Sequence, residues 1–137
     1  MRKFPLFSLE ETQKIAKEFA EKATLGDIFL LFGDLGSGKT TFSRFFIQSF
    51  FGDHTLNVTS PTFPIIQTYG PHNEIWHIDL YRIDDESEIY NLGLEEAQNK
   101  SIMIIEWPEK LGNYRPHGNI IHLNFSIIDS TRILIQV

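Results

Sequence analysis

The chain has 137 residues, a length suited to one domain with one hydrophobic core over residues 1–137. Its 12 basic and 18 acidic residues give a net charge of −6, which argues against independent binding of a nucleic-acid backbone. The absence of cysteine excludes disulfides, thiolate nucleophiles and cysteine-based zinc sites. The longest apolar run, residues 28–32, is far shorter than the ~20 residues of a membrane-spanning helix, and the N-terminal residues lack a secretory pattern. We therefore expect a cytoplasmic protein.

The first half of the chain predicts a helix, a strand and a second helix. Ser8 and Glu11 fit a capping box, and apolar residues recur at helical spacing from there towards Gly26. Residues 28–32 are wholly apolar, which is typical of a strand buried on both faces. A glycine-rich turn and a second helical pattern that ends at Gly52 follow. This order of elements is the opening of an α/β sheet.

The second half of the chain is richer in strand patterns. The expected elements are a hairpin of residues 64–69 and 74–80, a helical segment 84–100 interrupted at Gly93, a buried strand 102–105, and a terminal hairpin of residues 119–128 and 132–137. We predict an α/β fold whose central sheet is mixed and mostly parallel, with flanking helices and a C-terminal antiparallel hairpin.

A phosphate-loop pattern stands at residues 33–40, between the apolar strand and the second helix. The segment Gly-Asp-Leu-Gly-Ser-Gly-Lys-Thr matches G-x-x-x-x-G-K-[ST] in full. Gly36 and Gly38 allow backbone angles that turn N–H groups inward, which favours a polyphosphate at the start of the helix. Lys39 can then reach the β- and γ-phosphates, and the hydroxyl of Thr40 can bind Mg²⁺. A plain glycine turn with an exposed lysine is the alternative, which the flanking strand and helix disfavour.

A nucleotide-hydrolysing site of this kind needs a second acid at the end of a neighbouring strand. Glu106 closes the strand at 102–105 and is the candidate, with a solvent-facing carboxylate as the alternative. His77 and Asp79 are expected on one face of another strand. Asp79 could orient the attacking water or bind metal-bound water. His77 is interpreted as a packing or hydrogen-bonded residue without a catalytic role.

Three competing interpretations are disfavoured, and one question stays open. A dinucleotide-binding site is disfavoured because Thr41 stands where the turn of such a site carries its third glycine. Residues 99–102 depart from the guanine-reading Asn-Lys-x-Asp pattern at their last position, which disfavours a GTPase. A zinc site at His77 and Asp79 lacks an evident third ligand. The loop that carries Thr62 is either ordered by γ-phosphate and Mg²⁺ or a simple lead-in to a strand.

Five segments together resemble the bacterial TsaE (YjeE) ATPases of tRNA threonylcarbamoyladenosine biosynthesis. In family order they are residues 33–41, 60–63, 77–82, 92–96 and 106–109. The first segment is common to many families, whereas the other four in this order are far more specific. The resemblance implies a P-loop NTPase fold, ATP and Mg²⁺ as ligands, and weak intrinsic hydrolysis. It also implies TsaD and TsaB proteins as partners, which carry the transfer chemistry and meet the tRNA.

The resemblance also implies roles for individual residues. Lys39, Asp79 and Glu106 are expected to act in hydrolysis, and Thr40 and Glu106 to hold the metal. The expected nucleotide-binding residues are Gly36, Ser37, Gly38, Lys39, Thr40, Thr41, Thr62, Trp107 and Arg132.

The leading hypothesis is an ATPase whose cycle resets or licenses a tRNA-modifying complex. Arg44, Arg82 and Arg115 are candidate arginine fingers, but none is clearly placed, so TsaD and TsaB are expected to stimulate hydrolysis. A small-molecule P-loop kinase is the alternative, disfavoured because residues 84–100 contain no arginine for a lid. A non-catalytic nucleotide sensor stays open, and predicts that Asp79→Asn leaves turnover unchanged.

Overall fold

The structure is a computed structural model that describes residues 1–61 and 65–137. Its helices and strands are, in chain order, β1 (Arg2–Leu6), α1 (Leu9–Lys22), β2 (Asp27–Phe32), α2 (Lys39–Phe51), β3 (Ile66–Tyr69), β4 (Ile75–Asp79), α3 (Ser87–Tyr90), β5 (Ile102–Glu106), β6 (Asn119–Ile128) and β7 (Thr131–Gln136), with 3-10 turns at Leu94–Glu96 and Pro108–Leu111. None of these helices has the length and apolarity that a membrane crossing requires.

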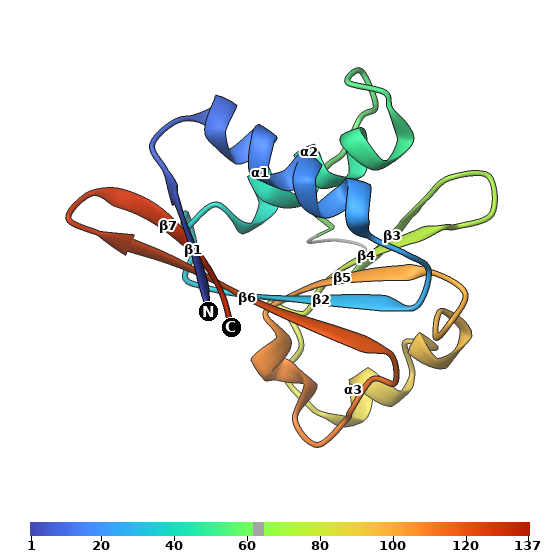
Figure 1. Ribbon diagram of the computed structural model, residues 1–137. Helices are drawn as coiled ribbons and strands as arrows, with labels where there is room; N and C mark the ends of the chain where they lie inside the picture. Colours follow the sequence, from blue (N-terminus) through green and yellow to red (C-terminus); the bar gives the residue numbers. More distant parts are fainter. Residues whose placement is uncertain (62–64) are drawn as a thin grey trace.

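The described strands form one seven-stranded sheet in the order β1-β7-β6-β2-β5-β4-β3. The central pairs β6–β2, β2–β5 and β5–β4 are parallel, and the flanking pairs β1–β7, β7–β6 and β4–β3 are antiparallel. The two chain ends lie side by side because β1 pairs with β7 (Figure 1). The predicted mixed sheet with a parallel centre and a C-terminal hairpin is confirmed.

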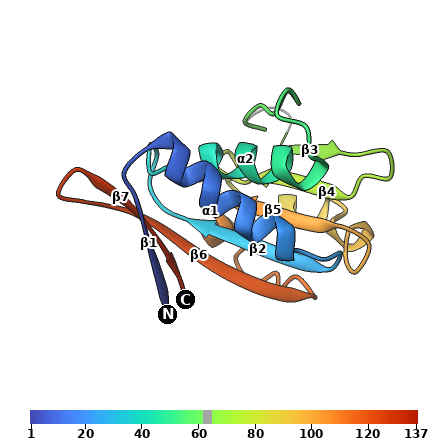
Figure 2. The ribbon, with the colours of Figure 1, turned by 45° about the horizontal axis from the view of Figure 1, so that its top comes forward.

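Two apolar layers enclose the sheet, one on each face. Helices α1 and α2 cover one face, while the two connections on either side of β5, from β4 to β5 and from β5 to β6, cover the other (Figures 1 and 2). The helical side is rich in aromatic rings: Phe19 meets Phe4, Phe29 and Phe42 edge to face, with ring centroids 5.9–6.3 Å apart. This packing fixes α1 and α2 against β2 and so holds the start of α2 in place.

The first half of the chain agrees with its sequence pattern. The hydroxyl of Ser8 caps α1 by accepting a hydrogen bond from the backbone N–H of Glu11 at 3.2 Å. Helix α2 ends at Gly52, whose φ of +63° is the left-handed conformation typical of a glycine cap. Strand β2 begins at Asp27, one residue before the predicted start.

Two parts of the fold differ from the prediction. Strand β1 was not predicted, and it forms an edge of the sheet by pairing with β7. Residues 84–100 were predicted to be helical but contain only the single turn α3 and a 3-10 turn. In this segment, acidic side chains accept hydrogen bonds from nearby backbone N–H groups, as Glu88 does from Asp84 and Asp85. Such bonds compete with the backbone pattern of a helix.

Candidate functional site

A cavity of about 460 Å³ opens where β2, β4 and β5 end, and its size lies within the ~300–1,000 Å³ usual for small-molecule sites. Its walls come from the β1–α1 junction, the phosphate loop, the ends of β4 and β5, and β7. The lining residues are Leu6, Phe7, Ser8, Leu9, Thr12, Asp34, Leu35, Gly36, Gly38, Lys39, Thr40, Thr41, Ser60, Asp79, Tyr81, Arg82, Glu106, Trp107 and Arg132. The carboxyl ends of parallel strands are where open α/β sheets bind their ligands.

The start of α2 faces this cavity with its backbone donors. The first N–H groups of any helix have no partner within the helix, and here Gly38 at the N-cap brings no side chain to satisfy them. Gly38 has a φ of +108°, and Gly36 has a φ of +78°, which are conformations that glycine adopts readily. No acidic residue stands in the first turn. The helix start is therefore suited to an anion.

Lys39 carries the charge that complements an anion here. Its ammonium group donates to the carbonyls of Gly33 and Asp34, and it lies 4.0 Å from the centre of the Trp107 ring. Burial lowers the pKa of Lys39, and the nearby acids, Glu106 first among them, oppose that shift. Trp107 thus borders the loop, held with a φ of +59°.

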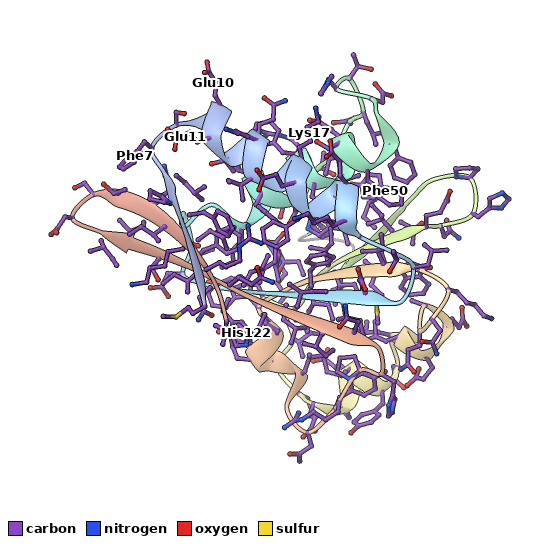
Figure 3. All side chains as sticks on the ribbon, viewed as in Figure 1. Phe7, Glu10, Glu11, Lys17, Phe50 and His122 are labelled. Carbon is purple, nitrogen blue, oxygen red and sulfur yellow. The ribbon has the colours of Figure 1, made fainter. Side chains whose placement is uncertain are left out.

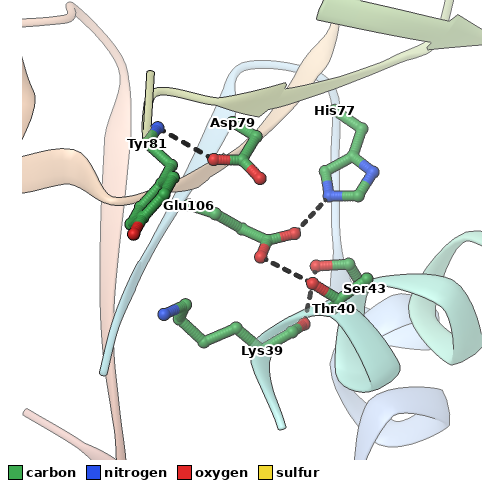
Figure 4. A network of polar contacts seen from close by, with 7 residues as sticks. All are labelled: Lys39, Thr40, Ser43, His77, Asp79, Tyr81 and Glu106. Carbon is green, nitrogen blue, oxygen red and sulfur yellow. Dashed lines mark hydrogen bonds and ion pairs between the residues drawn. The ribbon is translucent and has the colours of Figure 1, made fainter. Parts of the chain in front are cut away.

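A chain of polar contacts connects α2 to the sheet (Figure 4). The hydroxyl of Thr40 donates to Oε1 of Glu106 at 2.9 Å, and Nε2 of His77 lies 2.6 Å from Oε2 of the same carboxylate. Glu106 is 1% exposed, and His77 is 0% exposed. The solvent-facing alternative for Glu106 is therefore wrong. The expected packing or hydrogen-bonded place of His77 is confirmed.

Asp79 lies beside this network at the end of β4. One carboxylate oxygen accepts a hydrogen bond from the backbone N–H of Tyr81 at 2.9 Å. Burial raises the pKa of Asp79; the Tyr81 bond opposes that shift, and the charge of Glu106 adds to it. A buried carboxylate that also lines the cavity can contact a ligand there.

The remaining predicted site residues differ in whether they line the cavity. Arg132 lies on β7, where its Nε donates to the carbonyl of Gly36 at 3.1 Å and so ties the terminal hairpin to the loop. Ser37 is 2% exposed and does not line the cavity. Thr41 does line it. Thr62, predicted to bind the nucleotide, lies outside the described residues.

Two features of the site were missed from the sequence. The first is the wall from the β1–α1 junction, where Phe7 and Leu9 are 71% and 64% exposed, like Leu35 of the loop at 69%. Figure 3 shows Phe7 on this junction, at the outside of the molecule. The second is the pairing of His77 with Glu106. The alternation of β4 indicated the face of His77, but nothing local indicated its partner.

Comparison with known proteins identifies the family. A profile of the family described as threonylcarbamoyl adenosine biosynthesis protein TsaE matches residues 6–133. The tRNA threonylcarbamoyladenosine biosynthesis protein TsaE of Rickettsia bellii (strain RML369-C) is 44% identical over 133 residues, covering 96% of this chain and 91% of that protein. The chain belongs to the TsaE family. The resemblance inferred from the five sequence segments is thereby confirmed, and the family takes part in tRNA threonylcarbamoyladenosine biosynthesis.

One sequence match and one solved structure from Bacillus subtilis support the same family and fold. The protein named TsaE in strain 168 is 41% identical over 113 residues, which is 81% of this chain and 69% of that protein. The crystal structure of Bacillus subtilis YdiB superposes with a TM-score of 0.79 at 30% identity, covering 98% of this chain and 83% of that one. The predicted fold class is therefore confirmed by a solved structure as well as by the described strands.

Proposed function

We propose that this TsaE-family chain binds ATP with Mg²⁺ and hydrolyses it slowly, as an accessory protein in tRNA threonylcarbamoyladenosine biosynthesis. The observation that carries the proposal is the meeting of three features in one cavity: the uncapped start of α2, the ammonium group of Lys39, and the Thr40–Glu106 pair. Each feature matches one part of an ATP–Mg²⁺ complex. Their combination distinguishes the site from a general anion site.

The phosphates would lie against the start of α2. Backbone N–H groups there, together with the helix dipole, favour negative charge. Lys39 at present satisfies its ammonium group with the carbonyls of Gly33 and Asp34. A phosphate oxygen would offer it a charged acceptor, and hydrogen bonds between ions are stronger than those to neutral carbonyls. The lysine is therefore expected to turn from these carbonyls to the phosphates when ATP binds.

The residues at the end of β5 fit a magnesium ion. Thr40 and Glu106 present a hydroxyl and a carboxylate 2.9 Å apart, and Mg²⁺ prefers such oxygen ligands. Bound Mg²⁺ would neutralise charge that develops on the phosphates. Thr40 would bind the ion through its oxygen, and Glu106 would bind it directly or through a water molecule. Asp79, whose ionised form is destabilised by burial, would accept a hydrogen bond from the attacking water and orient it.

Slow hydrolysis is expected because, among the described residues, no contact directs an arginine towards the place of the γ-phosphate. Arg44 stacks on Phe45, 4.9 Å from the ring centre, and Arg115 donates to the carbonyl of Gly112. Arg82 lines the cavity, and Arg132 also lines it but is bonded to the loop. An arginine finger contributes ~10³–10⁵ in rate, so a partner that adds or repositions one would control turnover. We infer that the TsaD and TsaB proteins are those partners, and that ATP turnover cycles their complex.

The proposal is tested by measuring phosphate release with and without purified TsaD and TsaB. We expect slow release by the chain alone, at least tenfold stimulation by the two proteins together, and loss of release in Lys39→Ala and Asp79→Asn. Equal rates with and without the partners would contradict the cycling role. An Asp79→Asn variant with unchanged turnover would favour the sensor, and phosphate transfer to an added nucleoside or small alcohol would favour the kinase.

A further inference from the structure

His77 is a buried polar side chain to which the proposed function assigns no role. It lies on β4 with 0% exposure, and its Nε2 is 2.6 Å from Oε2 of Glu106. Its other ring nitrogen, Nδ1, is buried and has no hydrogen-bond partner among the described residues. An apolar residue would fill this place without an unsatisfied nitrogen, so packing alone does not account for a histidine. The contact with Glu106 therefore needs its own explanation.

The sheet register places His77 to act on Glu106. In the parallel pair β4–β5, His77 lies opposite Ile104 and Asp79 lies opposite Glu106. Side chains two residues apart on a strand share a face, so Glu106 and His77 both point towards α2. A carboxylate without a proton can only accept hydrogen bonds, so we assign the hydrogen of this contact to Nε2 of His77. The carboxylate is thus held at both ends, by His77 at Oε2 and by Thr40 at Oε1 (Figure 4).

These two bonds differ in what happens when the nucleotide binds. The hydroxyl oxygen of Thr40 is one of the proposed metal ligands, so its present bond to Glu106 changes when Mg²⁺ arrives. The bond from His77 comes from the opposite side and need not change. A glutamate side chain has three rotatable bonds, and without an anchor its carboxylate would lose its fixed orientation towards the metal. His77 is the anchor that remains.

We propose that His77 is a positioning residue, whose Nε2–H holds the carboxylate of Glu106 so that Oε1 faces Thr40 and the Mg²⁺–nucleotide. The proposal rests on the proposed function, since it concerns the same metal site. It assigns His77 no contact with ATP and no transfer of a proton. Groups that orient metal ligands in this way typically change metal affinity about 10–100-fold when removed.

Two variants that differ in reach provide the main test. In His77→Gln the amide nitrogen stands three bonds from Cβ, as Nε2 does, whereas in His77→Asn it stands two bonds away, as Nδ1 does. We expect His77→Gln to retain the bond to Glu106 and His77→Asn to lose it. The measurement is the ratio of ATP dissociation constants in EDTA and in Mg²⁺, obtained by calorimetry. Ile75→Val, a small core change on the same strand with no polar contact, is the control for lost stability.

The expected result separates positioning from a purely structural role. His77→Asn should lose about tenfold or more of the Mg²⁺ enhancement while its ATP affinity in EDTA stays within about twofold. His77→Gln and Ile75→Val should keep the wild-type enhancement. Equal enhancement in the Asn and Gln variants would overturn the positioning role. If the wild-type chain binds ATP without any Mg²⁺ enhancement, the magnesium part of the proposed function fails first, and the positioning role falls with it.

A second measurement needs neither nucleotide nor folding of a His77 variant. In the nitrogen-15-labelled wild-type chain, NMR should detect His77 with its proton on Nε2 and protected from solvent, because that hydrogen is bonded to Glu106. Glu106→Gln should shift this signal, whereas Ile75→Val should leave it in place. A proton on Nδ1 alone, or a signal indifferent to Glu106→Gln, would overturn the proposal whatever the binding data show.

Discussion

Gly33 is the residue at which the phosphate loop leaves the sheet, and replacing it with alanine gives the sharpest test of the loop's geometry. Its φ is +146°, a conformation that side chains rarely adopt. A Cβ there would lie 2.5 Å from the carbonyl oxygen of Phe125 on β6 and 2.7 Å from Oγ of Ser37. The backbone strain costs ~1–3 kcal/mol, and overpacking adds ~1–3 kcal/mol. Together they predict a loss of about 2–6 kcal/mol in the free energy of unfolding.

Gly36 offers a matched control within the same loop. It also has a positive φ, +78°, but a Cβ there would meet nothing within 4 Å. Gly36→Ala should therefore cost only the left-handed conformation, ~1–2 kcal/mol. For a domain of this size, each kcal/mol of lost stability lowers the melting temperature by roughly 4 °C. The melting temperature should therefore fall by about 8–24 °C in Gly33→Ala and by about 4–8 °C in Gly36→Ala. Equal melting temperatures for the two variants would refute the close approach of loop and β6.

Three further predictions concern charge and capping. Lys39→Ala should weaken ATP–Mg²⁺ binding by about 10–100-fold, because charge-assisted hydrogen bonds contribute ~1.5–3 kcal/mol; unchanged affinity in equilibrium dialysis would contradict this. Asp79→Asn should stabilise the chain at neutral pH, because burial raises the pKa of Asp79 and the ionised form therefore destabilises the folded state. In urea unfolding, the gain in the free energy of unfolding should shrink as the pH falls towards 3.8, the ordinary pKa of an aspartate side chain. A gain that does not depend on pH would exclude the raised pKa of Asp79 as its cause. Ser8→Ala should cost about 1 kcal/mol in the same assay through the lost bond to Glu11, and full wild-type stability would show that the cap contributes nothing.

The positions of the glycine-rich loop and of the two acids were predictable because each depends on local sequence. The spacing of residues 33–40 between an apolar strand and a helix identifies the loop without any knowledge of distant contacts. Glu106 and Asp79 were each expected on or at the end of a strand. The structure places these two strands side by side and parallel, so that both acids lie at one edge of the sheet. Their nearness depends on the strand order, which the sequence did not predict.

The bond between His77 and Glu106 was not predictable because it depends on register. The residues are 29 positions apart, and they meet only because His77 lies opposite Ile104 in the β4–β5 pair. A shift of one residue in that pairing would move one side chain relative to the other. Local alternation gives a face but not a partner, so the anchoring of Glu106 required the folded structure.

Strand β1 was not predicted and residues 84–100 were wrongly predicted to be helical, for different reasons. Strand β1 contains Pro5, which disfavours a strand except at a sheet edge, and it forms only by pairing with β7 at the other end of the chain. Residues 84–100 were predicted helical from their polar and acidic character. Side chains of Asp85 and Glu88 instead bond to backbone N–H groups and hold the segment in turns.

If the start of α2, Lys39 and the Thr40–Glu106 pair together bind ATP with Mg²⁺, calorimetric titration of the purified chain with ATP, in Mg²⁺ and then in EDTA, will detect that binding. We expect saturable binding at one site per chain, weakened when Mg²⁺ is removed and weakened again in Lys39→Ala. No heat of binding under either condition, with TsaD and TsaB absent or present, would contradict it.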